Sequence, residues 1–290
     1  MKQTRIKVMG YCFMMMTALL CSCSSDDDNT QQDDSNGRCM RQLTISNVMM
    51  NTRAAIDPKA YTATWEITDR PTYINLSRLS AELRYGTLTP STAGTSTTLT
   101  GSVYCGMRDN IAIILPNVTP VLPSGENYPV DLRGQKGTLA DIGARYHYIY
   151  GEGKVESVDG GTATGSITNT KSLLSLCKFT FTNGVSPVNV KSVQIGWGTN
   201  GAGGYPNSGT VSLADPANVH VTAGAPIADT PLVVTLDNAN TDGVVYVALF
   251  PCETKLSFHF TVSDGTNTYT ATKNAKMLEG KYYEVPVAVN

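Results

Sequence analysis

The sequence predicts an all-β protein built from one or two β-sandwiches. Short runs of alternating apolar and polar residues recur along the chain, and turn-forming residues interrupt them about every ten residues. Gly, Thr, Ser, Asn and Val are abundant, which favours strands and tight turns over helices. Because helical periodicity is scarce, packed sheets are the architecture that buries the apolar positions.

The expected strands run from residue 42 to the C-terminus. They are residues 42–50, 111–115, 145–150, 178–182, 192–197, 244–250, 257–262, 268–272 and 282–289. Tyr146, Tyr148 and Tyr150 fall on one face of the third of these strands. Asp264-Gly265 predicts a hairpin turn.

Only two segments have helical character, residues 75–85 and residues 171–176. Between the two groups of strands, residues 159–170 are rich in Gly and Thr, and a new set of strands starts soon afterwards. We therefore predict an N-terminal sandwich over residues 40–168 and a C-terminal sandwich over residues 169–290.

Residues 1–22 resemble a bacterial lipoprotein signal peptide. Three basic residues precede an apolar segment, residues 8–20, that is too short to span a bilayer. Leu20-Cys21-Ser22-Cys23 then resembles a lipobox, which predicts lipid attachment at Cys23. The acidic run at residues 26–28 resembles the export signal of surface lipoproteins in Bacteroides-like bacteria. The alternatives are an ordinary cleaved signal peptide and a buried N-terminal strand.

Residues 23–39 are predicted to form an acidic polar tether. Residues 24–38 have no aliphatic side chain, so they cannot bury enough apolar area to offset ordering. Without residues 1–22 the chain keeps 19 Lys and Arg against 24 Asp and Glu, a formal charge of −5. This balance excludes a general nucleic-acid binder.

Beyond Cys23 the chain has four cysteines at wide spacings, which are Cys39, Cys105, Cys177 and Cys252. An even number in an exported chain permits disulfides, and buried thiols fit the spacing at least as well. No pair has the short spacing of a zinc site.

The sequence contains no signature of an enzyme, a cofactor site or a metal site. Residues 196–201 match GxGxxG, but glycines and a proline follow where a dinucleotide site needs a helix. His147, His220 and His259 lie far apart and lack metal-ligand spacing. Trp197 and Tyr205 share a glycine-rich loop and are the best candidates for stacking on a sugar ligand.

A set of degenerate motifs, in this order behind the lipobox, resembles the fimbrillin family of Bacteroides-type lipoproteins, which are pilus subunits and their relatives. The motifs are Asn51-Thr52-Arg53-Ala54, Ser102-Val103-Tyr104, Asp109-Asn110-Ile111-Ala112, Gln135-Lys136-Gly137-Thr138-Leu139, Phe179-Thr180-Phe181 with Val190–Ile195, and Leu278-Glu279-Gly280-Lys281-Tyr282-Tyr283.

The resemblance implies two tandem transthyretin-like β-sandwich domains and assembly by donor-strand exchange. A trypsin-like protease would cut between Arg53 and Ala54, and a strand from the next subunit would replace residues 42–50. Within the removed strand, Leu43, Ile45 and Met49 are predicted to fill the groove. The alternative is that Arg53 lies in an ordinary loop of an uncut protein.

The resemblance also implies a place in the outer membrane or a fimbrium, with other pilus subunits and host proteins or glycans as partners. The chain ends at Asn290, directly after a strand with apolar residues on one face, and Pro286 suits an edge position there. No spare donor strand is therefore expected, which favours a tip or accessory subunit over a stalk subunit. The main rival is a glycan-binding surface lipoprotein for nutrient capture.

Overall fold

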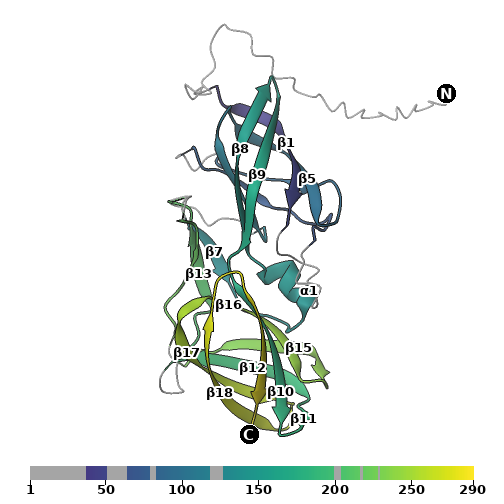
Figure 1. Ribbon diagram of the computed structural model, residues 1–290, viewed down its shortest axis with the longest axis vertical. Helices are drawn as coiled ribbons and strands as arrows, with labels where there is room; N and C mark the ends of the chain where they lie inside the picture. Colours follow the sequence, from purple (N-terminus) through teal and green to yellow (C-terminus); the bar gives the residue numbers. More distant parts are fainter. Residues whose placement is uncertain are drawn as a thin grey trace, which may run out of the picture.

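The protein is an elongated, almost entirely β-structured molecule with two halves stacked end to end (Figure 1). The computed structural model describes residues 37–50, 64–78, 83–117, 127–198, 204–215, 218–227 and 229–290. The predicted all-β class is confirmed. The predicted transthyretin-like topology stays a prediction.

The N-terminal half is one eight-stranded sheet, ordered β3-β2-β6-β8-β9-β1-β5-β4. Its strands are β1 (Cys39–Met49), β2 (Thr72–Asn75), β3 (Tyr85–Thr87), β4 (Thr89–Pro90), β5 (Ser96–Cys105), β6 (Asn110–Leu115), β8 (Ile149–Asp159) and β9 (Thr162–Ser172). The two edge strands β3 and β4 are separated in sequence by Leu88 alone, which is fully buried. The sheet therefore folds back on itself around a core of its own.

The C-terminal half is a β-sandwich of two four-stranded sheets. One sheet contains β10 (Ser175–Asn183), β11 (Ser186–Pro187), β16 (Val244–Leu249) and β19 (Tyr282–Ala288). The other contains β12 (Val190–Trp197), β15 (Leu232–Asn240), β17 (Cys252–Ser263) and β18 (Thr268–Met277). Phe179 and Phe181 of the first sheet pack edge-on against Phe260 of the second, with ring centroids 5.0 and 5.7 Å apart.

A segment from the middle of the N-terminal sequence packs on the C-terminal half. It comprises β7 (Asn127–Asp131), α1 (Leu139–Asp141) and a π-helical turn, Ile142–Tyr146. β7 pairs with β13 (Ser208–Ser212), which also pairs with β14 (Val221–Ala223). The Gln135 side chain donates to the carbonyls of Leu132 and Ala248 and accepts from the Ala248 N–H. The two halves are therefore connected both through this segment and through the chain that passes from β9 to β10.

Two predicted local structures are wrong, and the predicted helix over residues 75–85 is contradicted at its ends, because Asn75 ends β2 and Tyr85 begins β3, while residues 79–82 lie outside the described residues. Residues 145–150 alternate as a strand would, but a π-helical turn runs through Tyr146 and β8 begins only at Ile149. Residues 171–176 are not helical; they end β9 and begin β10. In both cases tertiary pairing decides a short segment whose local preference is weak.

The Gly- and Thr-rich stretch 159–170 is a hairpin turn followed by most of β9. The chain passes from the N-terminal sheet to the C-terminal sandwich at Leu173 and Leu174, both of which are buried. The boundary predicted between residues 168 and 169 therefore falls inside a strand. The glycines there serve a tight turn and a close strand approach.

Candidate functional site

β1, the strand that was predicted to be removable, lies in the middle of the N-terminal sheet. It pairs antiparallel with β5 from Cys39 to Met49 and parallel with β9 from Gln42 to Ile45. Taking β1 out would therefore expose main-chain groups on two neighbouring strands.

The inward face of β1 is apolar. Leu43, Ile45 and Val48 are fully buried, and Met50 just beyond the strand is 5% exposed. They pack into a cluster with side chains from five other strands, from Leu88 and from the buried Trp65. Burying one aliphatic side chain of this size stabilises a protein by about 1.5–3 kcal/mol. β1 therefore supplies a large share of the core of this half.

Met49 was predicted to point into this core, but it is 61% exposed. The reason is a β-bulge. Between Ile45 and Val48 the strand has one more residue than its partner β5, and Asn47 adopts a left-handed conformation with φ of 55°. The extra residue reverses the alternation, so Val48 and Met50 take the inward positions.

The end of β1 that lies nearer the N-terminus is held by a buried ion pair. The Arg38 guanidinium donates from Nε to both oxygens of Asp109 at 2.7 and 2.9 Å, and its Nη2 lies 2.7 Å from Oδ1. Asp109 also accepts from the Asn75 amide at 2.7 Å and from the Gly106 N–H at 2.8 Å. Asp109 is 2% exposed, so its charge depends on these partners.

Arg41 fastens the same end of the strand through three main-chain carbonyls. Its Nε donates to Gly160 and its Nη2 to Gly37, each at 3.0 Å, and its Nη1 donates to Cys105. Burial raises the pKa of the Cys105 thiol to about 11, although the Arg41 guanidinium opposes this rise. This end of the groove that β1 fills between β5 and β9 is therefore polar and charged, and the rest is apolar.

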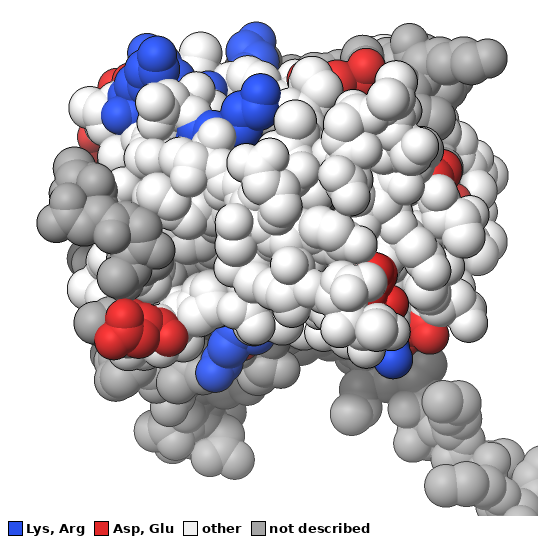
Figure 2. Space-filling view, turned by 90° about the horizontal axis from the view of Figure 1, so that it is seen from below, with Lys and Arg blue, Asp and Glu red and all other residues white. Residues whose placement is uncertain are grey.

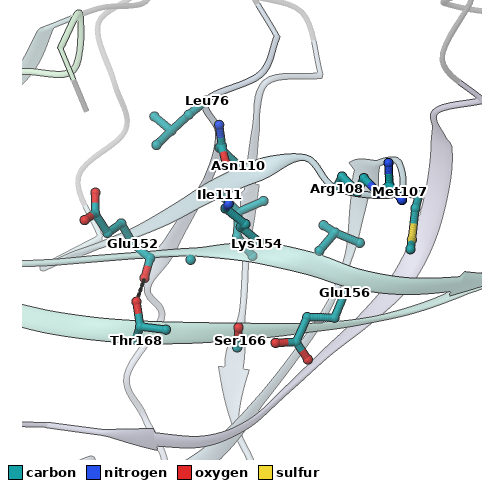
Figure 3. A pocket seen from close by; sticks show the side chains of 12 residues that line it. Leu76, Met107, Arg108, Asn110, Ile111, Glu152, Lys154, Glu156, Ser166 and Thr168 are labelled. Carbon is teal, nitrogen blue, oxygen red and sulfur yellow. Dashed lines mark hydrogen bonds between the residues drawn. The ribbon is translucent and has the colours of Figure 1, made fainter. Parts of the chain in front are cut away.

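An open groove of about 760 Å³ lies against β6, β8 and β9 (Figure 3). Leu76 and Met107 line it together with the charged side chains of Arg108, Lys154 and the two glutamates Glu152 and Glu156. The Glu152 and Glu156 carboxylates lie on different sides of the view in Figure 3. The groove has mixed charge and its polar groups do not converge on one point, so it defines no ligand class.

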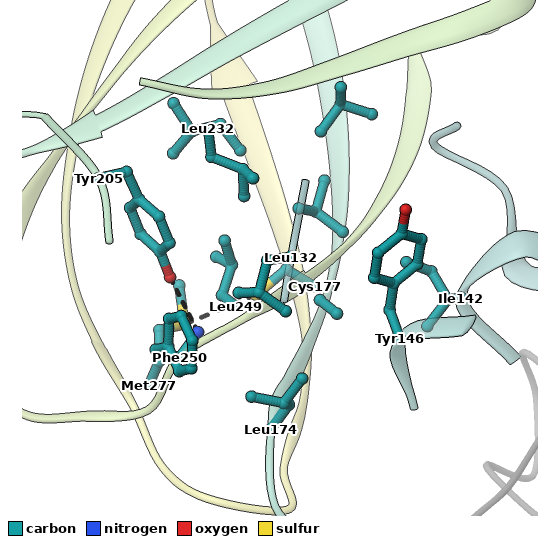
Figure 4. Packing of buried hydrophobic residues seen from close by; sticks show 14 of the residues in the cluster. Leu132, Ile142, Tyr146, Leu174, Cys177, Tyr205, Leu232, Leu249, Phe250 and Met277 are labelled. Carbon is teal, nitrogen blue, oxygen red and sulfur yellow. Dashed lines mark hydrogen bonds between the residues drawn. The ribbon is translucent and has the colours of Figure 1, made fainter. Parts of the chain in front are cut away.

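The predicted aromatic platform is corrected for Tyr205. Its side chain is fully buried, and its hydroxyl accepts a hydrogen bond of 2.9 Å from the Phe250 N–H (Figure 4). Trp197 is half-buried and packs against Tyr205 and Phe258, with ring centroids 4.8 and 6.4 Å apart. Tyr205 is a core residue, and it has no face left for a sugar.

The strand β19 near the C-terminus lies at the edge of its sheet, parallel to β10. Tyr283 and Val285 are half-buried, and Val287 and Val289 are buried, as their shared face predicts. Pro286 lies opposite Thr180 with its side chain exposed. β19 is part of the folded sandwich and is not a spare strand.

Cys23, Arg53 and Ala54 lie outside the described residues, so lipid attachment and cleavage stay predictions. β1 ends four residues before Arg53 in sequence. In the described part of the chain, no three His, Cys, Asp or Glu side chains gather as metal ligands. Within the same residues, no helix is long and apolar enough to cross a membrane.

The surface at the free end of the C-terminal half is mostly uncharged (Figure 2). Lys and Arg gather near one margin of this view, and Asp and Glu lie at several places around the rim. On this face of the molecule the basic side chains form no continuous surface.

No protein-family model matches the sequence, and no curated protein is detectably similar to it. The chain is similar in fold to solved structures that include the following two. A proposed cell adhesion protein of Bacteroides ovatus is 13% identical, with a TM-score of 0.55 over 87% of this chain and 96% of the other. A second one, from Bacteroides uniformis, is 15% identical, with a TM-score of 0.53 over 87% of this chain and 97% of the other.

Proposed function

We propose that the protein is a surface-attached adhesin or pilus subunit that works by contact, and that its N-terminal half accepts a strand from a neighbouring subunit in place of β1. The observation that carries this proposal is the position of β1. It is a central strand with an apolar inward face, and it ends shortly before Arg53. The two solved structures of similar fold, both described as proposed cell adhesion proteins, support the adhesive part.

Cleavage after Arg53 would break the peptide chain between β1 and the rest of the protein while leaving β1 bound in its place in the sheet. An incoming strand would then restore the ladder to β5 and β9 and refill the apolar positions now held by Leu43, Ile45 and Val48. Such strand addition obtains affinity from main-chain hydrogen bonds and specificity from the side-chain pockets.

The charged end of the groove restricts the donor. Without β1, Asp109 would keep Asn75 and Gly106 as partners but would lose Arg38. A buried carboxylate without its cation costs about 3–5 kcal/mol. The donor should therefore carry Arg or Lys at the position of Arg38, five residues before an inward-facing aliphatic residue at the position of Leu43.

The protein is proposed to accept a strand without donating one. β19 is paired with β10 along its length, and its inward residues Val287 and Val289 belong to the core of the C-terminal half. Releasing β19 would break that core. This supports a tip or accessory subunit, held at the outer membrane by a lipid on Cys23.

The experiment is limited trypsin digestion of the purified exported protein, in the presence of a reductant. We expect a new N-terminus at Ala54, and we expect cleaved protein to bind a labelled peptide that has the sequence of residues 37–50. Replacing Arg38 by Gln in the peptide should weaken binding by about 100-fold. Arg53→Ala protein, which cannot be cut there, is the matched control and should not bind the peptide. If cleaved and Arg53→Ala proteins bind the peptide equally, strand replacement is refuted.

A further inference from the structure

The described residues contain one pair of cysteines that face each other across two hydrogen-bonded strands. Cys39 of β1 lies directly opposite Cys105 of β5 in the antiparallel register. Opposite residues in such a pair point to the same face, with Cα atoms about 4.5–5.5 Å apart. A disulfide needs a Cα separation of about 4.4–6.8 Å. The backbone therefore already has the geometry that this bond requires.

We propose that Cys39 and Cys105 form a disulfide bond that fastens β1 to β5 when the protein is outside the reducing cytoplasm. The bond would lie at the end of β1 that also holds the Arg38–Asp109 ion pair and the Arg41 contacts. It would close a loop of about 67 residues, and long loops gain the most from such a closure.

The other two cysteines lack this arrangement. Cys177 lies on β10, opposite Val247 and Tyr283, and Cys252 lies on β17, opposite Met277. β10 and β17 belong to different sheets of the sandwich. Cys177 is completely buried, and its thiol donates to the Met277 sulfur at 3.7 Å. These two residues are expected to stay thiols.

The chemistry is thiol–disulfide exchange with a protein or small-molecule disulfide as the oxidant. Cys39 is only partly buried, so its thiolate attacks the oxidant disulfide, forms a mixed disulfide and releases one thiolate. The Cys105 thiolate then attacks the Cys39 sulfur and releases the second thiolate. The oxidant takes up both electrons, and the two protons lost by the cysteines go to the two released thiolates. The Arg41 guanidinium, which contacts the Cys105 carbonyl, favours the anionic form of Cys105 in the second step.

The disulfide has a consequence for strand exchange, and this consequence alone depends on the proposed function. After a cut at Arg53, a β1 peptide joined through Cys39 would remain attached to Cys105. The neighbouring strand could then displace β1 completely only after the bond was reduced. The redox state of the cysteine pair would therefore control whether β1 can leave its place between β5 and β9.

The test starts with intact cells treated with a thiol-alkylating reagent, followed by peptide mass spectrometry of the protein they export. We expect the peptides of Cys39 and Cys105 to be found joined, with the pair unalkylated until dithiothreitol is added. Cys177 and Cys252 should be alkylated after denaturation without any reductant. Recovery of alkylated Cys39 and Cys105 without reductant would overturn the proposal.

Thermal unfolding of purified protein gives a second readout. Reduction should lower the melting temperature of the N-terminal half by about 10 °C. Cys39→Ser should be less stable by a similar amount and insensitive to reductant, whereas the control Cys252→Ala should keep the wild-type response. An equal response of Cys39→Ser and wild-type protein to reductant would contradict the bond.

The two proposals fail in different ways. If trypsin-cut protein releases β1 without any reductant, the disulfide is refuted and strand exchange stands. If the joined peptides are found but reduced, cut protein never exchanges its strand, the disulfide stands and the proposed function fails.

Discussion

Replacing Asp109 with Asn should destabilise the N-terminal half by about 3–5 kcal/mol, because it leaves the Arg38 guanidinium buried without a counter-charge. Arg38 is 8% exposed and Asp109 is 2% exposed, and their atoms lie 2.7–2.9 Å apart. An Asn side chain has the same shape as Asp but lacks the negative charge. Four donors now face that charge: Nε and Nη2 of Arg38, the Asn75 amide and the Gly106 N–H. Water cannot take over this role at such low exposure.

The assay is urea unfolding followed by tryptophan fluorescence. The chain has two tryptophans, and Trp65 is buried in the core of the N-terminal half while Trp197 lies in the C-terminal sandwich. In a Trp197→Phe background the signal therefore reports the half that contains Asp109. The transition of Asp109→Asn should occur at a clearly lower urea concentration, with an unchanged slope.

The matched control is Asp131→Asn in protein that keeps Trp197 as the reporter, because β7 packs on the C-terminal half. Asp131 pairs with Arg133 at 2.6 Å, but 71% of the Arg133 side chain and 48% of the Asp131 side chain are exposed. An exposed pair contributes about 0–1 kcal/mol. The double variant Arg38→Met with Asp109→Leu should regain most of the lost stability, because it removes both charges. Equal effects of the two Asp→Asn changes would refute the reasoning.

Three further predictions follow from single residues. Gly137 has φ of +72°, and a Cβ there would lie 2.9 Å from a Val245 methyl carbon, so Gly137→Ala should cost about 1–3 kcal/mol more in urea unfolding than Gly184→Ala, which has φ of +67° and open space. Tyr205→Phe leaves a buried main-chain N–H unpaired, and the C-terminal half should lose about 1–3 kcal/mol without any loss of binding to glycan arrays. Four hydrogen bonds, two from main-chain and two from side-chain groups, lower the pKa of Asp264 to about 2, so its contribution to stability is complete above pH 4 and is lost as the pH falls through 2; an NMR titration of its carboxyl carbon with a midpoint near 4 would contradict this.

The β1 region shows how far the sequence predicts the fold. The alternation of Leu43 and Ile45 correctly predicts a strand with an apolar inward face, because period-two patterning is a local property. When the same alternation is extended through residues 47 and 49, it places Met49 in the core, and this is wrong. The bulge at Asn47 depends on the pairing with β5, and a partner strand more than 40 residues away leaves no local signal for it.

Tyr205 illustrates a different limit. In sequence it follows a run of glycines, which is typical of a surface loop. In the structure the chain turns inward after that run, and the ring fills the space between Trp197 and Phe250. The neighbouring Pro206 restricts the backbone at this point, which is a sequence signal for an ordered segment. Residue type alone, however, does not distinguish a buried aromatic ring from an exposed one.

The polar end of the groove was also missed, although its residues were visible in the sequence. Arg38 belongs to the predicted tether, and Asp109 follows the turn before the expected strand 111–115. They are 71 positions apart, so only the sheet register brings them together. Likewise, the even cysteine count permits a disulfide, while the opposition of Cys39 and Cys105 needs the register of β1 on β5.

The two ends of β1 are held very differently, and this gives strand exchange a direction. Toward the N-terminus, the ion pair of Arg38, the three carbonyl contacts of Arg41 and the ladders to both β5 and β9 act together. Beyond Ile45 the ladder to β9 ends, and past the bulge β1 pairs with β5 alone, aided by hydrogen bonds from Trp65 and Thr170. In the proposed exchange, opening would therefore start at the end next to the predicted cut, and an incoming strand would replace β1 progressively toward Asp109. The ion pair and the proposed disulfide would be the last contacts to break, so they would control completion of the exchange and not its beginning.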